Sequence, residues 1–136
     1  MTAAEPRDAV DLITTALDQI VTAIEAAGIA ATRDPGDFQP PAAIVGPPTI
    51  TGAATMQSIG LTVPVYIVTP DPGQPGLDWM LAQVATLLPV FGETAAEPTL
   101  WTSPLAGPGG LPAYVITVRA NVSTTYTERI YDAIHR

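Results

Sequence analysis

Two stretches of this 136-residue chain carry apolar side chains at intervals of three and four residues, the spacing of one helix face. The first predicts a helix over about residues 6–27, with Pro6 in its first turn and Gly28 as its left-handed stop. The second runs from Leu77, with Asp78 as the expected N-cap and Gly92 at its end. The two apolar stripes are Val10, Ile13, Leu17, Ile20, Val21 and Ile24, then Leu77, Leu81, Val84, Leu88 and Phe91. Each stripe needs an apolar surface to cover.

The segments between and after these helices alternate with the period of two that is typical of strands. The clearest are residues 61–70 and 112–123, both rich in β-branched side chains. Shorter strands are predicted at 29–32, 42–45 and 99–103, and turns at 71–76 and 107–110. In the first long strand, Val63, Val65 and Ile67 share one face, and Tyr66 and Val68 share the other.

Prolines bound the strand predicted at 42–45. The stretch 34–48, DPGDFQPPAAIVGPP, holds five prolines and two glycines around Ala42–Val45. We interpret it as a stiff turn from Asp34 to Asp37 that leads into this short strand. Because proline has no backbone N–H, we expect the strand at a sheet edge with few ladder bonds.

A short helix is predicted near the C-terminus. Thr125 and Glu128 have the spacing of a capping box. Tyr126, Ile130 and Ile134 then fall on one helix face.

The predicted order is helix, three strands, helix, two strands and a terminal helix. The economical packing of these elements places the two main helices on one face of a mostly antiparallel sheet, so the expected class is α+β. The length fits a single domain, residues 1–136, without a separate linker or an internal repeat.

Half of the chain carries no charge. Asp, Glu, Lys and Arg are absent from 38–70, 79–92 and 98–118, runs of 33, 14 and 21 residues. Charged residues make up 13% of the chain, against about 25% in an average soluble domain. Long neutral surfaces are typical of places where another chain packs. The runs therefore favour an obligate oligomer, and the alternative is a domain whose polar surface is built from Thr, Gln and Ser.

The net charge of −8 argues against nucleic-acid binding, because an acidic protein repels phosphate. Residues 1–37 carry −5, residues 38–118 carry −4 and residues 119–136 carry +1. All five positive charges are arginines. The same repulsion suits a protein that must let DNA slide past it.

The composition removes most catalytic chemistry. The chain has no cysteine and no lysine, which excludes thiol nucleophiles, cysteine metal sites, a Walker-type phosphate loop and Schiff bases. His135 is the one histidine, and as the penultimate residue it is poorly placed to activate Ser58, Ser103 or Ser123.

Paired acids are the remaining catalytic option. Asp34 with Asp37, or Asp71 with Asp78, could act as acid and base or bind a hard cation. Asp beside Pro or Gly is more often ordinary turn chemistry. Trp79 and Trp101 are interpreted as core or interface anchors. We therefore predict that the protein is not an enzyme, with no catalytic, cofactor-binding or metal-ligating residue and no cofactor.

The sequence shows neither a signal peptide nor a membrane span. The N-terminus lacks a basic segment followed by an apolar one, and no apolar run reaches the roughly 18 residues of a spanning helix. The expectation is a protein that stays, or is assembled, inside a cell and has no membrane partner.

The pattern as a whole resembles a known family. A first helix ends in AAGI and leads through an Asp-Pro turn to PPAAIVGPP. A β-branched strand, the helix GLDWMLAQVATLL and the closing strand PAYVITVRANVS follow. In order and size this resembles the tail terminator proteins of long-tailed phages, particularly those of actinobacterial hosts. The many Ala, Pro and Gly residues, with Arg in place of Lys, suit hosts with high-GC genomes.

The resemblance implies a small α+β virion subunit that closes into a ring, usually a hexamer. Such a ring caps the tail tube, receives the head-completion or connector proteins at the tail–head junction, and passes DNA through its centre without sequence-specific contacts. It would be assembled in the host cytoplasm. The family has no invariant ligand motif, so no functional residue is transferred. Residues 1–5 and 124–136 are expected to contact partners, and the latter to dock on an acidic surface of a neighbour.

Two alternatives remain open. One is another head-to-tail connector, although adaptors are mainly helical and stoppers mainly β. The other is a small α+β enzyme or ligand-binding domain. A monomer with a deep pocket that gathers Asp34, Asp37 or His135 would favour this second class.

Overall fold

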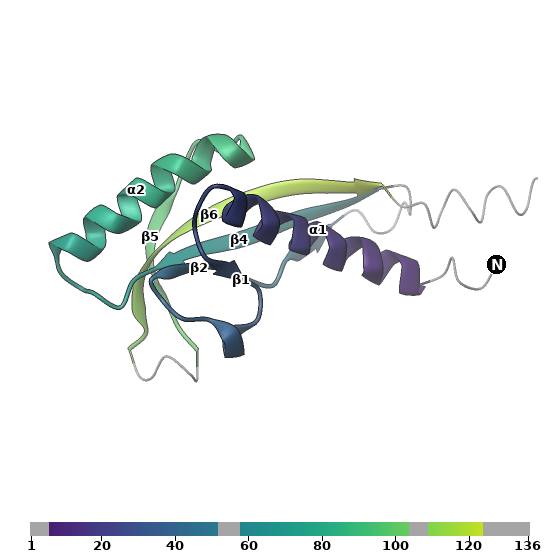
Figure 1. Cartoon of the computed structure of the whole chain (residues 1–136). Helices are drawn as coiled ribbons and strands as arrows, with labels where there is room; N and C mark the ends of the chain where they lie inside the picture. The colour runs from purple at the N-terminus through teal and green to yellow at the C-terminus, as the bar shows by residue number, and fades with distance from the viewer. Residues whose placement is uncertain (1–5, 52–57, 104–108, 124–136) are drawn as a thin grey trace, which may run out of the picture.

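Two helices cover one face of a six-stranded sheet, which confirms the α+β class (Figure 1). The computed structural model describes residues 6–51, 58–103 and 109–123. Its elements in order are α1 (Pro6–Ala26), β1 (Ala31–Thr32), the 3-10 helix η2 (Pro35–Asp37), β2 (Ala42–Val45), β3 (Thr49–Thr51), β4 (Ser58–Val68), α2 (Gln74–Phe91), β5 (Glu97–Trp101) and β6 (Leu111–Ser123).

The sheet is built around one long antiparallel pair, β4 and β6, which stay in register from Ser58 opposite Ser123 to Val68 opposite Ala113. The strand order is β1-β2-β4-β6-β5, and β3 also pairs with β4. Only β1 and β2 run parallel among the described pairs. β2 and β3 therefore share one edge of β4, β2 against residues 65–68 and β3 against residues 60–62.

A bulge separates β2 from β3. Val45 lies opposite Val65 and Thr49 opposite Thr62, so three residues on this edge face two on β4. Pro64 sits at this break, where its carbonyl accepts a hydrogen bond from Gly46 N–H (2.8 Å). The N–H and C=O of one residue point to the same side of a strand. The missing N–H of Pro64 therefore falls on the side of β2 and β3, where the bulge already interrupts the ladder of hydrogen bonds.

The edge position predicted for residues 42–45 is wrong. β2 is flanked by β1 on one side and β4 on the other, and all four of its residues are buried. The prolines lie before and after the strand, so every residue within it keeps its N–H group.

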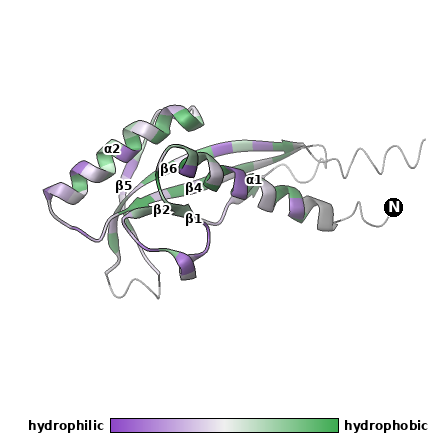
Figure 2. Cartoon of the chain, viewed as in Figure 1, coloured by the Kyte–Doolittle hydropathy of each residue, from purple (hydrophilic) through white to green (hydrophobic). Residues whose placement is uncertain are grey.

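The main core lies between the sheet and the helices. Alternate β4 residues from Ile59 to Ile67 face this core, as do alternate β6 residues such as Ile116 and Val118. The helices contribute Leu17, Ile20 and Ile24 from α1 and Met80, Val84 and Leu87 from α2. Figure 2 shows the apolar colour running along the strands and along parts of both helices.

Both predicted helices are confirmed, with one boundary corrected. Gly28 has φ +91° and Gly92 has φ +66°, as expected of helix stops. α2 starts at Gln74 with Gly73 as its N-cap, so the prediction of Asp78 as N-cap is wrong. Pro75 occupies the first turn, and Leu77 N–H already bonds Gly73 C=O (3.1 Å).

The strands at 112–123 and 61–70 are confirmed as β6 and β4, although β4 begins at Ser58. The strand expected at 99–103 lies two residues earlier, as β5. β3 was not predicted. The turn at 107–110 is described only for Gly109 and Gly110, both with positive φ. The C-terminal helix expected from Thr125 lies outside the described residues.

Candidate protein-contact surfaces

The sheet face opposite the helices carries a second, smaller apolar cluster. Register places it on the alternate residues that point away from the helices. Its members are Ile44, Val68, Trp101 and Ala113, with Phe38, Tyr66 and Leu111 packed against them. No helix in the described part of the chain covers this face (Figure 1). We call it the open face.

Trp101 anchors the open face. Its side chain is buried to 9% exposure, and its ring meets that of Phe38 edge-on, with centroids 4.8 Å apart and planes at 70°. Phe38 directly follows η2 and caps it through its backbone N–H, which bonds Pro35 C=O. The stiff turn at 34–37 thus delivers an aromatic side chain to the sheet.

The rest of the open face is uncharged over most of its area. Its threonines, assigned by register, are Thr49, Thr51, Thr62, Thr99 and Thr117. Among the described strand residues of this face, Glu97 on β5 and Arg119 on β6 are the charged ones. At its margins lie Glu93, which accepts the Arg119 N–H (3.2 Å), and Arg33. Outward faces of antiparallel sheets are ordinarily polar and solvated. Here threonines and apolar side chains take the place of the usual charges.

β3 is the most exposed element of the sheet. All three of its residues are exposed, and Ile50, although paired with Leu61, keeps 47% of its side chain in solvent. In the described chain β3 pairs only with β4, so the backbone N–H and C=O groups on its outer edge have no partner strand there. Its three side chains are all β-branched. Such edges readily accept another chain.

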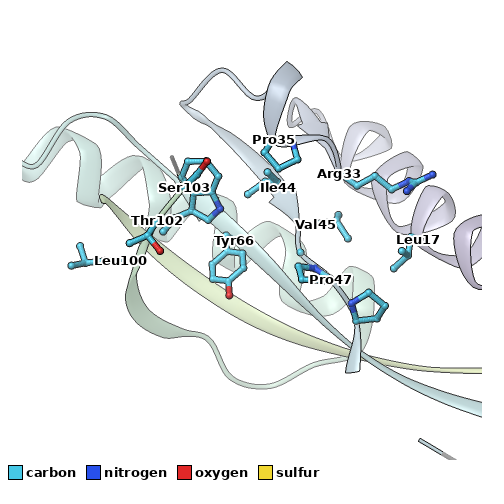
Figure 3. A pocket seen from close by; sticks show the side chains of 13 residues that line it. Leu17, Arg33, Pro35, Ile44, Val45, Pro47, Tyr66, Leu100, Thr102 and Ser103 are labelled. Carbon is cyan, nitrogen blue, oxygen red and sulfur yellow. The ribbon is translucent and has the colours of Figure 1, made fainter. Parts of the chain in front are cut away.

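A hollow of about 590 Å³ lies beside β2, on the side of η2 and the end of β5. Figure 3 shows Tyr66, Thr102 and Arg33 among its lining side chains. The Arg33 guanidinium turns toward α1 and binds Asp18 (Nε–Oδ1 2.6 Å). Neither Asp34 nor Asp37 lines this hollow.

Two of the four aspartates considered as catalysts, Asp34 and Asp71, hold turns together. Asp34 Oδ1 accepts a hydrogen bond from Gly36 N–H (2.8 Å), and Asp71 Oδ1 accepts one from Gly73 N–H (2.8 Å). Asp34 belongs to η2 as its N-cap. Asp71 precedes α2, and Asp78 lies within that helix, exposed. These bonds confirm the turn interpretation for Asp34 and Asp71.

Both turns follow the same five-residue pattern, which was not predicted. Thr32-Arg33-Asp34-Pro35-Gly36 and Thr69-Pro70-Asp71-Pro72-Gly73 share Thr-x-Asp-Pro-Gly. In each, the threonine hydroxyl accepts the aspartate N–H, at 3.1 Å and 3.2 Å. The motif is visible in the sequence as TRDPG and TPDPG. It forms the turn that follows β1 and the turn that follows β4.

Protein-family models, curated proteins and solved structures compared with the chain give no match.

Within the described residues, no group of three or more His, Cys, Asp or Glu side chains is placed to hold a metal ion. No helix described in the structure is long and apolar enough to cross a membrane.

The remaining candidate residues do not converge. Trp79 is half-buried against the main core, on the other face of the sheet from Trp101. Ser103 lines the hollow beside β2. Ser58 and Ser123 are register partners at the far end of the β4–β6 pair. His135 lies outside the described residues.

Proposed function

We propose that this protein is a structural subunit that closes into a ring and acts as a phage tail terminator, joining a tail tube to a head. The observation that carries the proposal is the open face, a broad sheet surface that the described helices leave uncovered and that is almost free of charge. Surfaces of this kind are stable in water chiefly when another protein covers them.

The edge strand β3 adds a second contact surface. Its exposed Ile50 and free outer edge lie in the longest uncharged run of the sequence, 38–70. An uncharged contact needs no buried ion pairs, whose desolvation offsets much of their attraction. The stiff turn that positions Phe38 and the prolines around β2 reduce the conformational entropy lost on binding.

The mixture of helix and sheet favours a terminator over a mainly helical adaptor or a mainly β stopper. The acidic balance is compatible with a channel through which DNA passes. In this proposal the partners are other copies of the chain, a tail tube protein and a head-completion protein, and the protein resides in the virion.

The proposal is tested by the oligomeric state. Mass photometry of the purified chain should show a ring-sized assembly, expected to be a hexamer. Thr49→Glu adds a charge to an exposed position where β3 meets the open face, and it should weaken assembly at least tenfold. Thr86→Glu, at an exposed position of α2, is the matched control and should assemble as wild type. A wild-type chain that remains monomeric at micromolar concentration contradicts the proposal.

A further inference from the structure

A groove of about 390 Å³ runs between the two helices, above the end of β6. α1 lines it with Leu12, Ala16 and Ala23 among others, α2 with Phe91, and β6 with residues 120–122. The groove lies on the helix side of the sheet and is separate from the open face.

Two of the residues that line the groove on α1 are alanines. Ala16 and Ala23 are seven residues apart, two helical turns, so they lie one above the other on the same side of α1. Their small side chains let another backbone approach closely. Leu12 of α1 and Phe91 of α2 are the larger apolar side chains of its lining. Apolar grooves of this form bind amphipathic helices through anchors spaced three or four residues apart.

One rim of the groove is acidic. Thr15 lines the groove, and Asp11 and Asp18 are its neighbours on the helix surface, four residues before it and three after it. Both carboxylates are exposed. Asp18 is bound by Arg33 (2.6 Å), which leaves Asp11 as the carboxylate available to a basic partner.

Residues 124–136 offer an apolar stripe and an arginine for this groove, and their net charge is zero, with Arg129 and Arg136 balanced by Glu128 and Asp132. β6 ends at Ser123, directly after groove residue Val122, and residues 124–136 follow. In that segment Tyr126, Ile130 and Ile134 recur every four residues, as helix anchors do. Arg129 follows Tyr126 by three residues and would lie beside this apolar stripe if the segment is helical.

We propose that residues 124–136 of one copy bind as a helix in the α1–α2 groove of the next copy, with Arg129 facing Asp11. The inference rests on the proposed ring and identifies one of its subunit contacts. A neighbouring copy is favoured over the same chain because only Thr124 and the capping residue Thr125 connect Ser123 to the helix. Strand-to-helix connections ordinarily have two to six residues, so this one has the shortest length from which the chain could turn back over its own strand.

Disulfide trapping tests this contact directly, because the chain has no cysteine of its own. The double variant Thr15→Cys/Ala133→Cys pairs an exposed groove residue, four residues after Asp11, with a residue on the apolar side of the tail, four residues after Arg129, as in a tail helix parallel to α1. Ala82→Cys/Ala133→Cys is the matched control, since Ala82 is exposed on α2 and does not line the groove. After mild oxidation the first should give a ladder of covalent oligomers on a non-reducing gel, and the control should remain monomeric.

A peptide measurement gives the affinity. A fluorescein-labelled peptide of residues 124–136 should bind the full chain whose own tail carries Ile130→Glu and Ile134→Glu, as followed by fluorescence anisotropy. Ala23→Trp fills the groove and should weaken binding at least tenfold, whereas Ala26→Trp, three residues on and exposed, should change it less than twofold. Circular dichroism of both variants checks that they fold.

The outcomes separate this inference from the proposed ring. A ladder together with groove-dependent peptide binding supports the contact. An intramolecular disulfide in a monomer overturns the contact alone. So does a wild-type chain that forms the ring while Thr15→Cys/Ala133→Cys gives no cross-linked oligomers. A monomeric wild-type chain overturns the ring and this contact together.

Discussion

At both Thr-x-Asp-Pro-Gly turns, two hydrogen bonds close the backbone around a proline. The threonine hydroxyl accepts the aspartate N–H, and the aspartate carboxylate accepts the glycine N–H two residues on. Proline at the fourth position fixes φ and has no N–H to satisfy. The same short sequence therefore ends β1 and β4 in the same way, and commits the chain to leave the sheet sharply.

The aspartates of these turns have a measurable structural role. Asp34→Ala and Asp71→Ala each leave a glycine N–H without its acceptor and should each lower the free energy of unfolding by about 1 kcal/mol. Asp34→Asn and Asp71→Asn keep an acceptor oxygen and should recover most of the loss. Urea unfolding followed by tryptophan fluorescence measures all four. An alanine variant as stable as wild type would mean that the turn does not depend on this bond.

Gly76 is required by close packing and not by an unusual φ. A Cβ atom at this position would lie 2.1 Å from the Asp71 carbonyl oxygen, a backbone atom that cannot move without displacing the second turn. Gly76→Ala should therefore cost about 3 kcal/mol. Gly28→Ala meets no atom within 4 Å but must adopt φ +91°, so it should cost only about 1–2 kcal/mol. Equal melting temperatures for the two variants would contradict this distinction.

At the scale of elements, the two faces of the sheet are packed differently. One face packs against α1 and α2, and the other holds the small cluster around Trp101 and Phe38. The short edge strand β5 delivers Trp101 to this second cluster, although its four preceding residues are exposed. Trp101 is thus the one buried residue that β5 contributes to the apolar cluster of the open face.

Trp101→Ala should accordingly destabilise the protein by about 3 kcal/mol, because a large buried ring is lost without a replacement. Leu100→Ala, one residue earlier and 58% exposed, should change stability by less than about 0.5 kcal/mol. Thermal unfolding of the two variants compares adjacent residues of one strand. A loss at Leu100 as large as that at Trp101 would show that β5 is packed from both sides.

Whether an element could be predicted from the sequence depends on how many residues its pattern of apolar side chains spans. α1, α2, β4 and β6 repeat their spacing over many residues, so their existence could be predicted. β3 could not, because the extra residue at Gly46–Pro48 resets the alternation and leaves only three residues to read. The sheet position of β2 was also hidden, since its neighbour β1 contributes only two residues. The neutral runs predicted a contact surface, but only strand register shows that Thr49, Thr62 and Thr99 share one face.

At the scale of the whole molecule, the proposed tail-to-groove contact is heterologous. The donor, residues 124–136, differs from the acceptor between α1 and α2, so each copy offers one of each. Contacts of this kind continue from copy to copy and close into a ring when the rotation between neighbours allows it. The open face and β3 remain available to further contacts, either within the ring or with the proteins above and below it.

The charge of the whole chain leads to a last prediction, on DNA. A net charge of −8 with five arginines and no lysine repels phosphates, and the released counterions that drive non-specific DNA binding require many basic contacts. The assembled protein should therefore not retard a short DNA duplex in a gel even at about 50 mM salt, where such binding is strongest. Retardation that disappears at about 200 mM salt would reveal a basic surface formed only on assembly. Arg7, Arg119 and Arg136 are the side chains available for it, since Arg33 binds Asp18 and Arg129 is assigned to Asp11. That outcome would mean that the channel of the proposed ring binds DNA through its phosphates instead of letting it pass without contact.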